Sequence, residues 1–308
     1  MSASVVTSSA RAPERGEGGP PWCYPSGVSR LESLAPGVWR LPLRTPTLPP
    51  ATHTNLMIVG ESKLALIEPA TPFEDEQRVL DDAVAQLSAE GREVAMLLIT
   101  HHHPDHVGDV ERLRQRHGVP LCAHAKTAAK LSMTIDRELD DGELVDLGDG
   151  VRLRAVHTPG HAPGHLVFHE QRSGIAHAGD MVAGEGTILI DRSDDGDMAQ
   201  YLDSLRRLGE LGTTALIPAH GPVLEDPQAI VDHYIRHRLA REAKVVAAID
   251  SGAVTIDEIV AIAYADTPRM LWPLAARALD AHLHKLEGEG VVVHDDEGYR
   301  PANSVVRD

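Results

Sequence analysis

The stretch that decides the fold is residues 100–107, Thr100-His101-His102-His103-Pro104-Asp105-His106-Val107. An apolar run, Val94 to Ile99, comes directly before it and is short, continuous and followed by a loop that contains proline. Such a run is typical of a strand buried on both faces. The metal-binding residue types of the stretch therefore follow the carboxyl end of a strand, where open α/β sheets place their sites. The alternative is a polar loop that is rich in histidine by chance, and the similar residues that recur downstream make it the weaker one.

Composition limits the classes of protein to consider. The chain has 308 residues, 42% of them hydrophobic, which is enough for one large domain with or without a smaller one. A formal charge of −17 argues against a binding surface for nucleic acid or anionic membranes, because such surfaces need clustered Lys and Arg. The net charge does not exclude a local basic groove. Two cysteines, Cys23 and Cys122, give no disulfide framework and fit a reducing compartment. Residues 1–21 lack the apolar core of a signal peptide and no later run reaches the length of a membrane span, so we expect a cytoplasmic protein without a membrane partner.

Short apolar runs and helical patterns alternate through the middle of the chain, which predicts an α/β domain. Apolar residues at helical spacing predict helices over 73–90, 107–117 and 198–208. Short apolar runs predict strands at 38–41, 55–59, 63–67, 94–99, 119–122, 143–146, 151–156 and 215–218, and on both sides of Gly179-Asp180.

The two ends of the chain differ from this middle region. Residues 1–34 are rich in Ser, Gly, Pro and Arg with little periodicity, which predicts a flexible tail. Three helices and a β-hairpin after residue 227 match the outline of a winged helix. We therefore divide the chain into a tail (1–34), an α/β domain (35–226) and a winged-helix-like domain (227–308). The predicted C-terminal helices are 229–250, 255–265, which opens with the capping-box-like Thr255-Ile256-Asp257-Glu258, and 271–289.

Seven ligand-type residues fall in four places where a predicted strand passes into a loop. A lone histidine after a strand is more often a hydrogen-bonded structural residue, but seven such residues in four equivalent places favour one shared metal centre. Imidazole and carboxylate ligands suit Zn²⁺, and also Fe²⁺ or Mn²⁺. The seven residues are His101, His103, Asp105, His106, His161, Asp180 and His220.

The same motifs resemble the metallo-β-lactamase fold superfamily over roughly residues 37–225. Residues 101–106 resemble its HxHxDH signature, and Thr158-Pro159-Gly160-His161, Gly179-Asp180 and Pro218-Ala219-His220-Gly221-Pro222 match its later motifs in order and spacing. The resemblance implies a four-layer αββα sandwich with its site at one edge of the sheets. It also implies that His101, His103 and His161 hold one metal, that Asp105, His106 and His220 hold a second, and that Asp180 bridges the two.

The implied chemistry is hydrolysis. Two zinc ions about 3.5–4 Å apart can share a hydroxide, because they lower the pKa of water to about 7, and this hydroxide attacks a carbonyl or phosphoryl centre. Asp105 would bind a metal and also orient the nucleophile. His165 either donates to the substrate or supports a metal ligand, and His102 is expected to take no part. Family members usually carry Asp where this chain has Glu68, so the support that this position gives to a metal ligand is in doubt.

The C-terminal domain narrows the resemblance to the beta-lactamase-like protein 2 group, which includes a single-strand endoribonuclease and, in related form, fungal polyketide thioesterases. From Val231 to the end, nine Lys and Arg stand against thirteen Asp and Glu, so this winged helix is not basic enough to grip nucleic acid. We therefore expect a two-zinc hydrolase of a small-molecule acyl substrate, a thioester, ester or lactone. The second alternative is a metal-dependent single-strand endoribonuclease, and the third is a non-catalytic metal-binding regulator. The sequence allows a homo-oligomer and does not decide the oligomeric state.

The first C-terminal helix carries four polar residues on one face. This face is expected to be solvated or to bind a substrate anion, and its residues are Tyr234, His237, Arg238 and Arg241.

Overall fold

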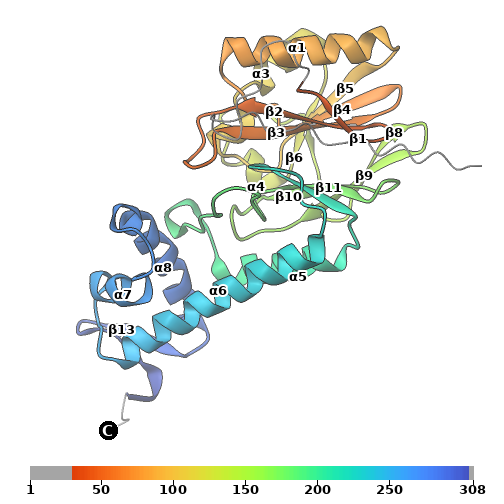
Figure 1. Ribbon diagram of the computed structural model, residues 1–308. Coiled ribbons are helices and arrows are strands. Elements are labelled where there is room, and N and C mark those ends of the chain that lie inside the picture. The colour runs from red at the N-terminus through yellow and green to blue at the C-terminus, as the bar shows by residue number, and fades with distance from the viewer. Residues whose placement is uncertain (1–29, 305–308) are drawn as a thin grey trace, which may run out of the picture. The chain divides into compact units, whose positions relative to one another are not determined.

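The computed structural model describes residues 30–304, and in it two β-sheets lie face to face (Figure 1). The first sheet has seven strands in the order β1-β2-β3-β4-β5-β6-β7, and the second has five in the order β12-β11-β10-β9-β8. The strands of the first sheet are β1 (Glu32–Ala35), β2 (Val38–Arg44), β3 (His53–Gly60), β4 (Lys63–Ile67), β5 (Glu93–Leu98), β6 (Leu121–Ala123) and β7 (Arg137–Glu138). Those of the second are β8 (Leu144–Gly148), β9 (Val151–His157), β10 (Leu166–Glu170), β11 (Ile175–Gly179) and β12 (Ala215–Pro218).

The alternation of side chains along β4 shows how the layers form. Leu64 and Leu66 point to one face of the sheet and join the cluster that packs against helices α1 (Glu74–Ala89) and α3 (Val110–His117). Ala65 and Ile67 point to the other face and pack against side chains of the second sheet. Burying a side chain of this kind stabilises the fold by about 1.5–3 kcal/mol.

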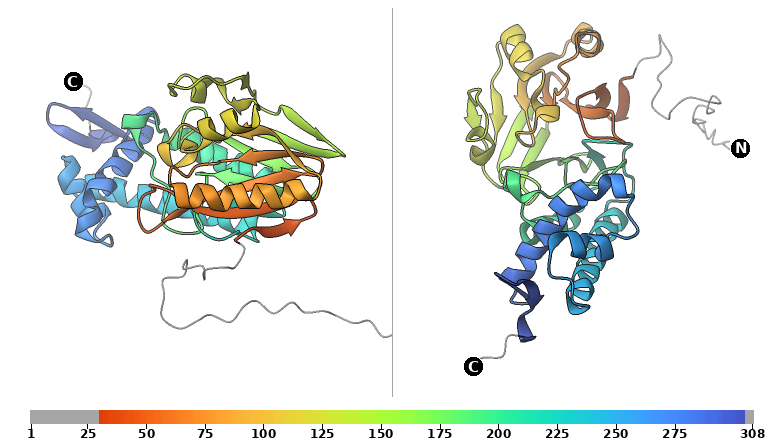
Figure 2. Two further views of the ribbon diagram at one scale, coloured as in Figure 1. Left: turned by 90° about the horizontal axis from the view of Figure 1, so that it is seen from above. Right: turned by 90° about the vertical axis from the view of Figure 1, so that its left-hand side faces the viewer.

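The outer face of the second sheet is covered by α5 (Met198–Glu210), whose Tyr201, Leu202 and Leu205 are buried against it. The order of layers is therefore helix, sheet, sheet, helix, and the two views of Figure 2 show α1 lying across the outer face of the first sheet. This confirms the four-layer sandwich expected from the sequence. Further short elements are the helices α2 (Pro104–Val107) and α4 (Ala125–Ala128) and the 3-10 turns η1 (Arg192–Asp194), η2 (Arg269–Leu271) and η3 (Ala302–Ser304).

The C-terminal region has a core of its own. Helices α6 (Pro227–Asp250), α7 (Ile256–Ala263) and α8 (Trp272–Gly288) pack with the hairpin of β13 (Val292–Asp295) and β14 (Gly298–Pro301). Helix α7 begins with the predicted capping box, in which Thr255 and Glu258 each bond the other's backbone N–H. The winged-helix prediction is confirmed.

Three predictions differ from the structure. The helix expected over 107–117 begins only at Val110, as α3, while Val107 ends the separate short helix α2; Asp109 N, between them, donates to Pro69 O instead of to a helical carbonyl. The short strand expected directly after Asp180 is not formed, since the chain turns directly after β11 and the next strand is β12. The end of the predicted tail, from Glu32, forms β1, while residues 1–29 of the tail lie outside the described residues, as does Cys23. Among the helices of residues 30–304, none has both the length and the apolar character needed to cross a bilayer.

Candidate metal centre

The seven predicted residues all lie in segments that follow the ends of strands. After β5, His101 and His103 lie in a loop and Asp105 and His106 in the short helix α2, and the loops after β9, β11 and β12 carry His161, Asp180 and His220. The structure brings the seven together in two overlapping groups. The first group is His101, His103, His161 and Asp180, and the second is Asp105, His106 and His220; in each group one potential ligand atom per residue lies within 4.8 Å of the others.

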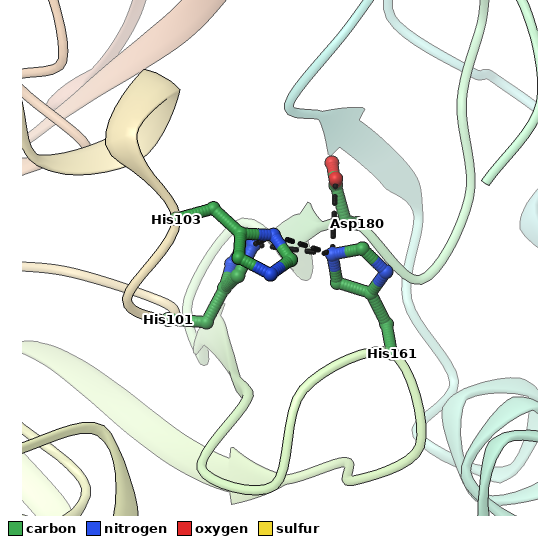
Figure 3. A group of neighbouring side chains, drawn as sticks. All are labelled: His101, His103, His161 and Asp180. Carbon is green, nitrogen blue, oxygen red and sulfur yellow. Dashed lines mark hydrogen bonds and ion pairs between the residues drawn. The ribbon is translucent and has the colours of Figure 1, made fainter. Parts of the chain in front are cut away.

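In the first group, three imidazole rings turn toward one another (Figure 3). His103 Nδ1 lies 2.9 Å from His101 Nε2 and 3.0 Å from His161 Nε2, and the two Nε2 atoms are 3.2 Å apart. Asp180 Oδ2 lies 3.3 Å from His161 Nε2. Four ligand atoms therefore face one small volume.

In the second group, His220 Nε2 lies 3.5 Å from Asp105 Oδ2, and His106 Nε2 lies 3.6 Å from Asp105 Oδ1. Asp180 reaches this group as well, since its Oδ1 is 3.5 Å from His220 Nε2 and its Oδ2 is 3.7 Å from His106 Nε2. Asp180 thus lies between the two groups, in the position expected of a bridging carboxylate.

The second ring nitrogen of every histidine in the centre has a partner that fixes its proton. His161 Nδ1 donates to Leu189 O (2.9 Å) and His220 Nδ1 to His53 O (3.0 Å). His103 Nε2 lies 2.6 Å from Asp194 Oδ2. A histidine that donates from one ring nitrogen to a carbonyl or carboxylate presents the other as a lone pair, as metal-binding histidines do.

Glu68 fixes the remaining two histidines. Its Oε2 accepts from His106 Nδ1 at 2.7 Å. Its Oε1 accepts from the hydroxyl of Thr100, and Thr100 Oγ1 in turn accepts from His101 Nδ1 at 2.9 Å. The sequence left this support in doubt because Glu is longer than Asp. In the structure Glu68 has a left-handed backbone (φ 63°), and its carboxylate bonds His106 directly and His101 through Thr100.

These contacts test whether the residues fit a metal. The three ring nitrogens of the first group all present lone pairs, so they cannot hydrogen-bond one another, and a shared cation relieves their repulsion. In a tetrahedral zinc site with Zn–N bonds of about 2.0–2.1 Å, ligand atoms lie about 3.3 Å apart, close to the 2.9–3.2 Å between these nitrogens. Within the described residues, His106 Nε2 and Asp180 Oδ1 are buried without a hydrogen-bond partner. The donor set fits two divalent cations.

The protonation of the centre differs between the two groups. Burial lowers the pKa of His103 to about 4 and also holds the pKa of His101 and His161 below its usual range. His106 behaves in the opposite way: burial alone would lower its pKa, but the carboxylates of Glu68, Asp105 and Asp180 outweigh burial and raise it. The pKa of Glu68 falls to about 2, because His106 outweighs the effect of burial. Burial thus favours the neutral, cation-binding form of the histidines in the first group, whereas the carboxylates around His106 favour its protonated form.

His165 lies under the centre and does not face into it. Its ring is fully buried, Nδ1 bonds Thr158 Oγ1 (2.8 Å) and Nε2 accepts from Asp180 N (3.1 Å). Burial lowers its pKa to about 3, so it is neutral. Both ring nitrogens bond within the protein, which favours the second of the two roles expected for His165, support of a residue of the centre, here Asp180. Asn55 donates to Pro218 O and Gly221 O on either side of His220, which agrees with the structural role expected for it.

Some residues of the centre could not be found from the sequence. Asp194 binds His103 and also lies 3.3 Å from His102 Nε2, although it is far from both in the chain. The carbonyls of Leu189 and His53 carry no sequence signal at all. The face of α6 was misjudged in part: Arg238 is buried and donates to Ile188 O, and Tyr234 Oη bonds Ala183, so these two side chains face the α/β domain, whereas His237 is exposed as expected.

Comparison with known proteins agrees with this geometry. Residues 49–220 match the family model described as the metallo-beta-lactamase superfamily, and residues 255–300 match that of the beta-lactamase associated winged helix domain. A beta-lactamase-like protein 2 homolog of Drosophila melanogaster is 29% identical over 77% of this chain and 83% of its own length. An atrochrysone carboxyl ACP thioesterase of Aspergillus chevalieri is 29% identical over 70% and 71%.

Solved structures show the same fold. A metallo-beta-lactamase family protein from Thermus thermophilus is 25% identical, with a TM-score of 0.71 over 87% of this chain and 100% of that one. A beta-lactamase domain protein from Burkholderia ambifaria is 22% identical, with a TM-score of 0.77 over 91% and 96%. The fold implies binding of divalent metal, in agreement with the cluster of His and Asp. The chain belongs to the metallo-beta-lactamase superfamily and carries the winged helix domain associated with it.

Proposed function

We propose that this protein is a two-metal hydrolase of acyl-type bonds, with zinc as its metal and a thioester, ester or lactone as its substrate. One observation carries the metal centre: each of the five histidines directs a ring nitrogen inward while its other nitrogen bonds an oxygen atom of the protein. Bound divalent cations would lower the pKa of water and polarise the oxygen of the scissile carbonyl.

We assign the roles of the chain's own residues from their positions. His101, His103 and His161 hold the first cation, and Asp105, His106 and His220 hold the second. Asp180 is the bridge, because its two oxygens face both groups. Asp105 lies at the edge of the second group, and part of its side chain is exposed. Its carboxylate can therefore accept a hydrogen bond from the attacking water and orient that water toward the substrate.

Two observations support an acyl substrate over RNA. One similar protein is named as an acyl carrier protein thioesterase, and hydrolysis of a thioester needs a water nucleophile and a polarised carbonyl, which a centre of this kind would supply. The charge of the chain is −17, and the arginines Arg238 and Arg241 of α6 are bound to carbonyls and to Asp266 instead of being free for phosphates. A single-strand endoribonuclease is the competing outcome of the test below.

The test offers zinc-loaded protein a panel of substrates: acyl-CoA thioesters, S-lactoylglutathione, a lactone, nitrocefin and labelled single-stranded RNA. We expect turnover of at least one acyl substrate, lost with chelator, restored by zinc and absent in His103→Ala. RNA cleavage that shows the same chelator and variant dependence, without acyl turnover, would replace the acyl proposal. A fully metal-loaded protein that turns over none of these would indicate a non-catalytic protein.

A further inference from the structure

The segment of residues 184–197, which we name the strap, orients two of the three histidines of the first group. Leu189 O accepts from His161 Nδ1 at 2.9 Å, and Asp194 Oδ2 lies 2.6 Å from His103 Nε2. Apart from the turn η1 the strap is irregular, so no helix or sheet ladder holds it in place. The direction in which His103 and His161 point therefore depends on what else fixes the strap.

Two arginines of the C-terminal helices bind the strap close to the residues that contact His161 and His103. Arg238 of α6 donates to Ile188 O, one residue before Leu189, and it is 5% exposed with its guanidinium over the ring of Tyr201. Arg277 of α8 pairs with the carboxylate of Asp191.

Asp191 transmits this second contact to Asp194. Its Oδ1 accepts from Ser193 N (3.0 Å) and Ser193 Oγ (2.9 Å), and its backbone carbonyl accepts from Asp194 N (3.1 Å). Arg277 thus anchors the turn that presents Asp194 to His103. A further ion pair joins Arg192 of the same turn to Asp280 of α8 at 3.4 Å.

The second group has different supports. Glu68, at the end of β4, holds His106, and the carbonyl of His53 in β3 holds His220. Both come from the first sheet, and the ring contacts described for these two histidines across residues 30–304 include none from α6 or α8. The contacts of Arg238 and Arg277 therefore reach the strap that supports the first group, whereas Glu68 and His53, which support the second, belong to the region of the first sheet.

We propose that Arg238 and Arg277 are positioning residues through which the winged-helix-bearing C-terminal domain sets the metal affinity of the first group. The inference rests on the proposed two-metal centre. Loss of either arginine removes one anchor from the middle of the strap, so that Leu189 O and Asp194 fix the rings of His161 and His103 less firmly. Loss of a group bonded directly to a metal-binding histidine typically costs about 10–100-fold in metal affinity, and the arginines act on two such groups, Leu189 O and Asp194, through the strap.

The test is zinc titration of the metal-free full chain against a chromogenic chelator. Wild type should take up two ions, and Arg277→Gln should bind one of them about 10–100-fold more weakly. Arg277→Lys, which keeps a cation near Asp191, should recover part of the loss. Arg236→Gln is the matched control, because Arg236 is an exposed arginine of α6, and it should titrate as wild type. Arg238→Met tests the second anchor in the same way.

Two backgrounds identify the affected group. In His220→Ala, which keeps the first group, Arg277→Gln should weaken the remaining zinc; in His161→Ala, which keeps the second, it should have no effect. Equal weakening in both backgrounds, or unchanged binding in both, would overturn the inference while leaving the proposed centre intact. A wild-type protein that takes up no zinc would overturn the centre itself and the inference with it. Thermal unfolding of the metal-free variants, expected within a few degrees of wild type for the half-exposed Arg277, separates lost affinity from lost folding.

Discussion

Glu68 Oε2 accepts a hydrogen bond from His106 Nδ1 at 2.7 Å, and both side chains are buried away from solvent. The Glu68 backbone is left-handed at φ 63°, a conformation that costs a non-glycine residue on the order of 1–3 kcal/mol. Its carboxylate offsets this cost by binding His106 and Thr100, which in turn bonds His101. One carboxylate therefore orients a histidine of each metal group.

The first prediction concerns this carboxylate. Glu68→Gln removes its charge and leaves an amide that cannot accept from His106 and Thr100 with equal strength. We expect zinc affinity of the second group to fall about 10–100-fold, measured by chelator competition. Glu74→Gln, an exposed glutamate of α1, is the control and should bind as wild type. Unchanged binding by Glu68→Gln would show that His106 does not depend on this bond.

The second prediction concerns pH. The raised pKa of His106 favours a proton on this ring in the metal-free protein, and a cation must displace that proton. Affinity of the second group should therefore rise with pH, by up to about tenfold per unit. Affinity of the first group should be flat between pH 6 and 8, because the pKa of His103 is about 4 and those of His101 and His161 are also lowered.

Calorimetric titration in buffers of different ionisation enthalpy measures the protons that zinc binding releases. Deprotonation of bound water also contributes, so the informative quantity is the difference between wild type and Glu68→Gln. Glu68 is the main group that raises the pKa of His106, so the variant should release fewer protons at neutral pH. Equal proton release by both proteins would contradict the assignment of the proton to His106.

The third prediction concerns Asp105. Asp105→Asn keeps the size of the side chain but removes the charge that holds the attacking water. Turnover should fall by about 10²–10⁴-fold for whichever substrate is found, while the fold is kept. Initial rates at saturating zinc measure this, and zinc content measured on the same samples separates lost chemistry from lost metal. A fully active variant would rule out the proposed role.

The fourth prediction concerns the glycine next to His161. Gly160 has φ 128°, and a Cβ there would lie 2.2 Å from the backbone nitrogen of Tyr201. Gly160→Ala should lower the free energy of unfolding by about 1–3 kcal/mol, as overpacked sites do. Gly288→Ala, at the end of α8 with nothing near the added carbon, should change it by less than about 0.5 kcal/mol. Denaturant unfolding of both variants measures this difference in stability. Equal free energies of unfolding would mean that α5 shifts to make room for the added carbon at Gly160.

The sequence predicted the parts of the fold that depend on local patterns. The strand predicted at 63–67 has the same first and last residue as β4, because a short apolar run between polar residues is typical of a buried strand. The seven residues of the centre were also found, since each follows a strand and the motifs resemble a known family. Whether they bind metal stays a prediction.

The remaining features depend on contacts between distant parts of the chain or on backbone geometry. Asp194 reaches His103 across 91 residues, and no spacing rule links them. The left-handed turn at Glu68, which makes a longer side chain fit, cannot be read from residue type. The burial of Arg238 on α6 was not predicted, because arginine is usually a surface residue. Only its packing against the strap shows that it is buried.

Metal content tests the central claim most directly. The full chain, stripped with chelator, reloaded with zinc and freed of excess metal, is measured by elemental analysis together with His161→Ala, His220→Ala and the double variant. The account predicts about two zinc ions per wild-type chain, about one in each single variant and none in the double variant. Zinc content that is zero in the wild type, or that does not change in the variants, would contradict it.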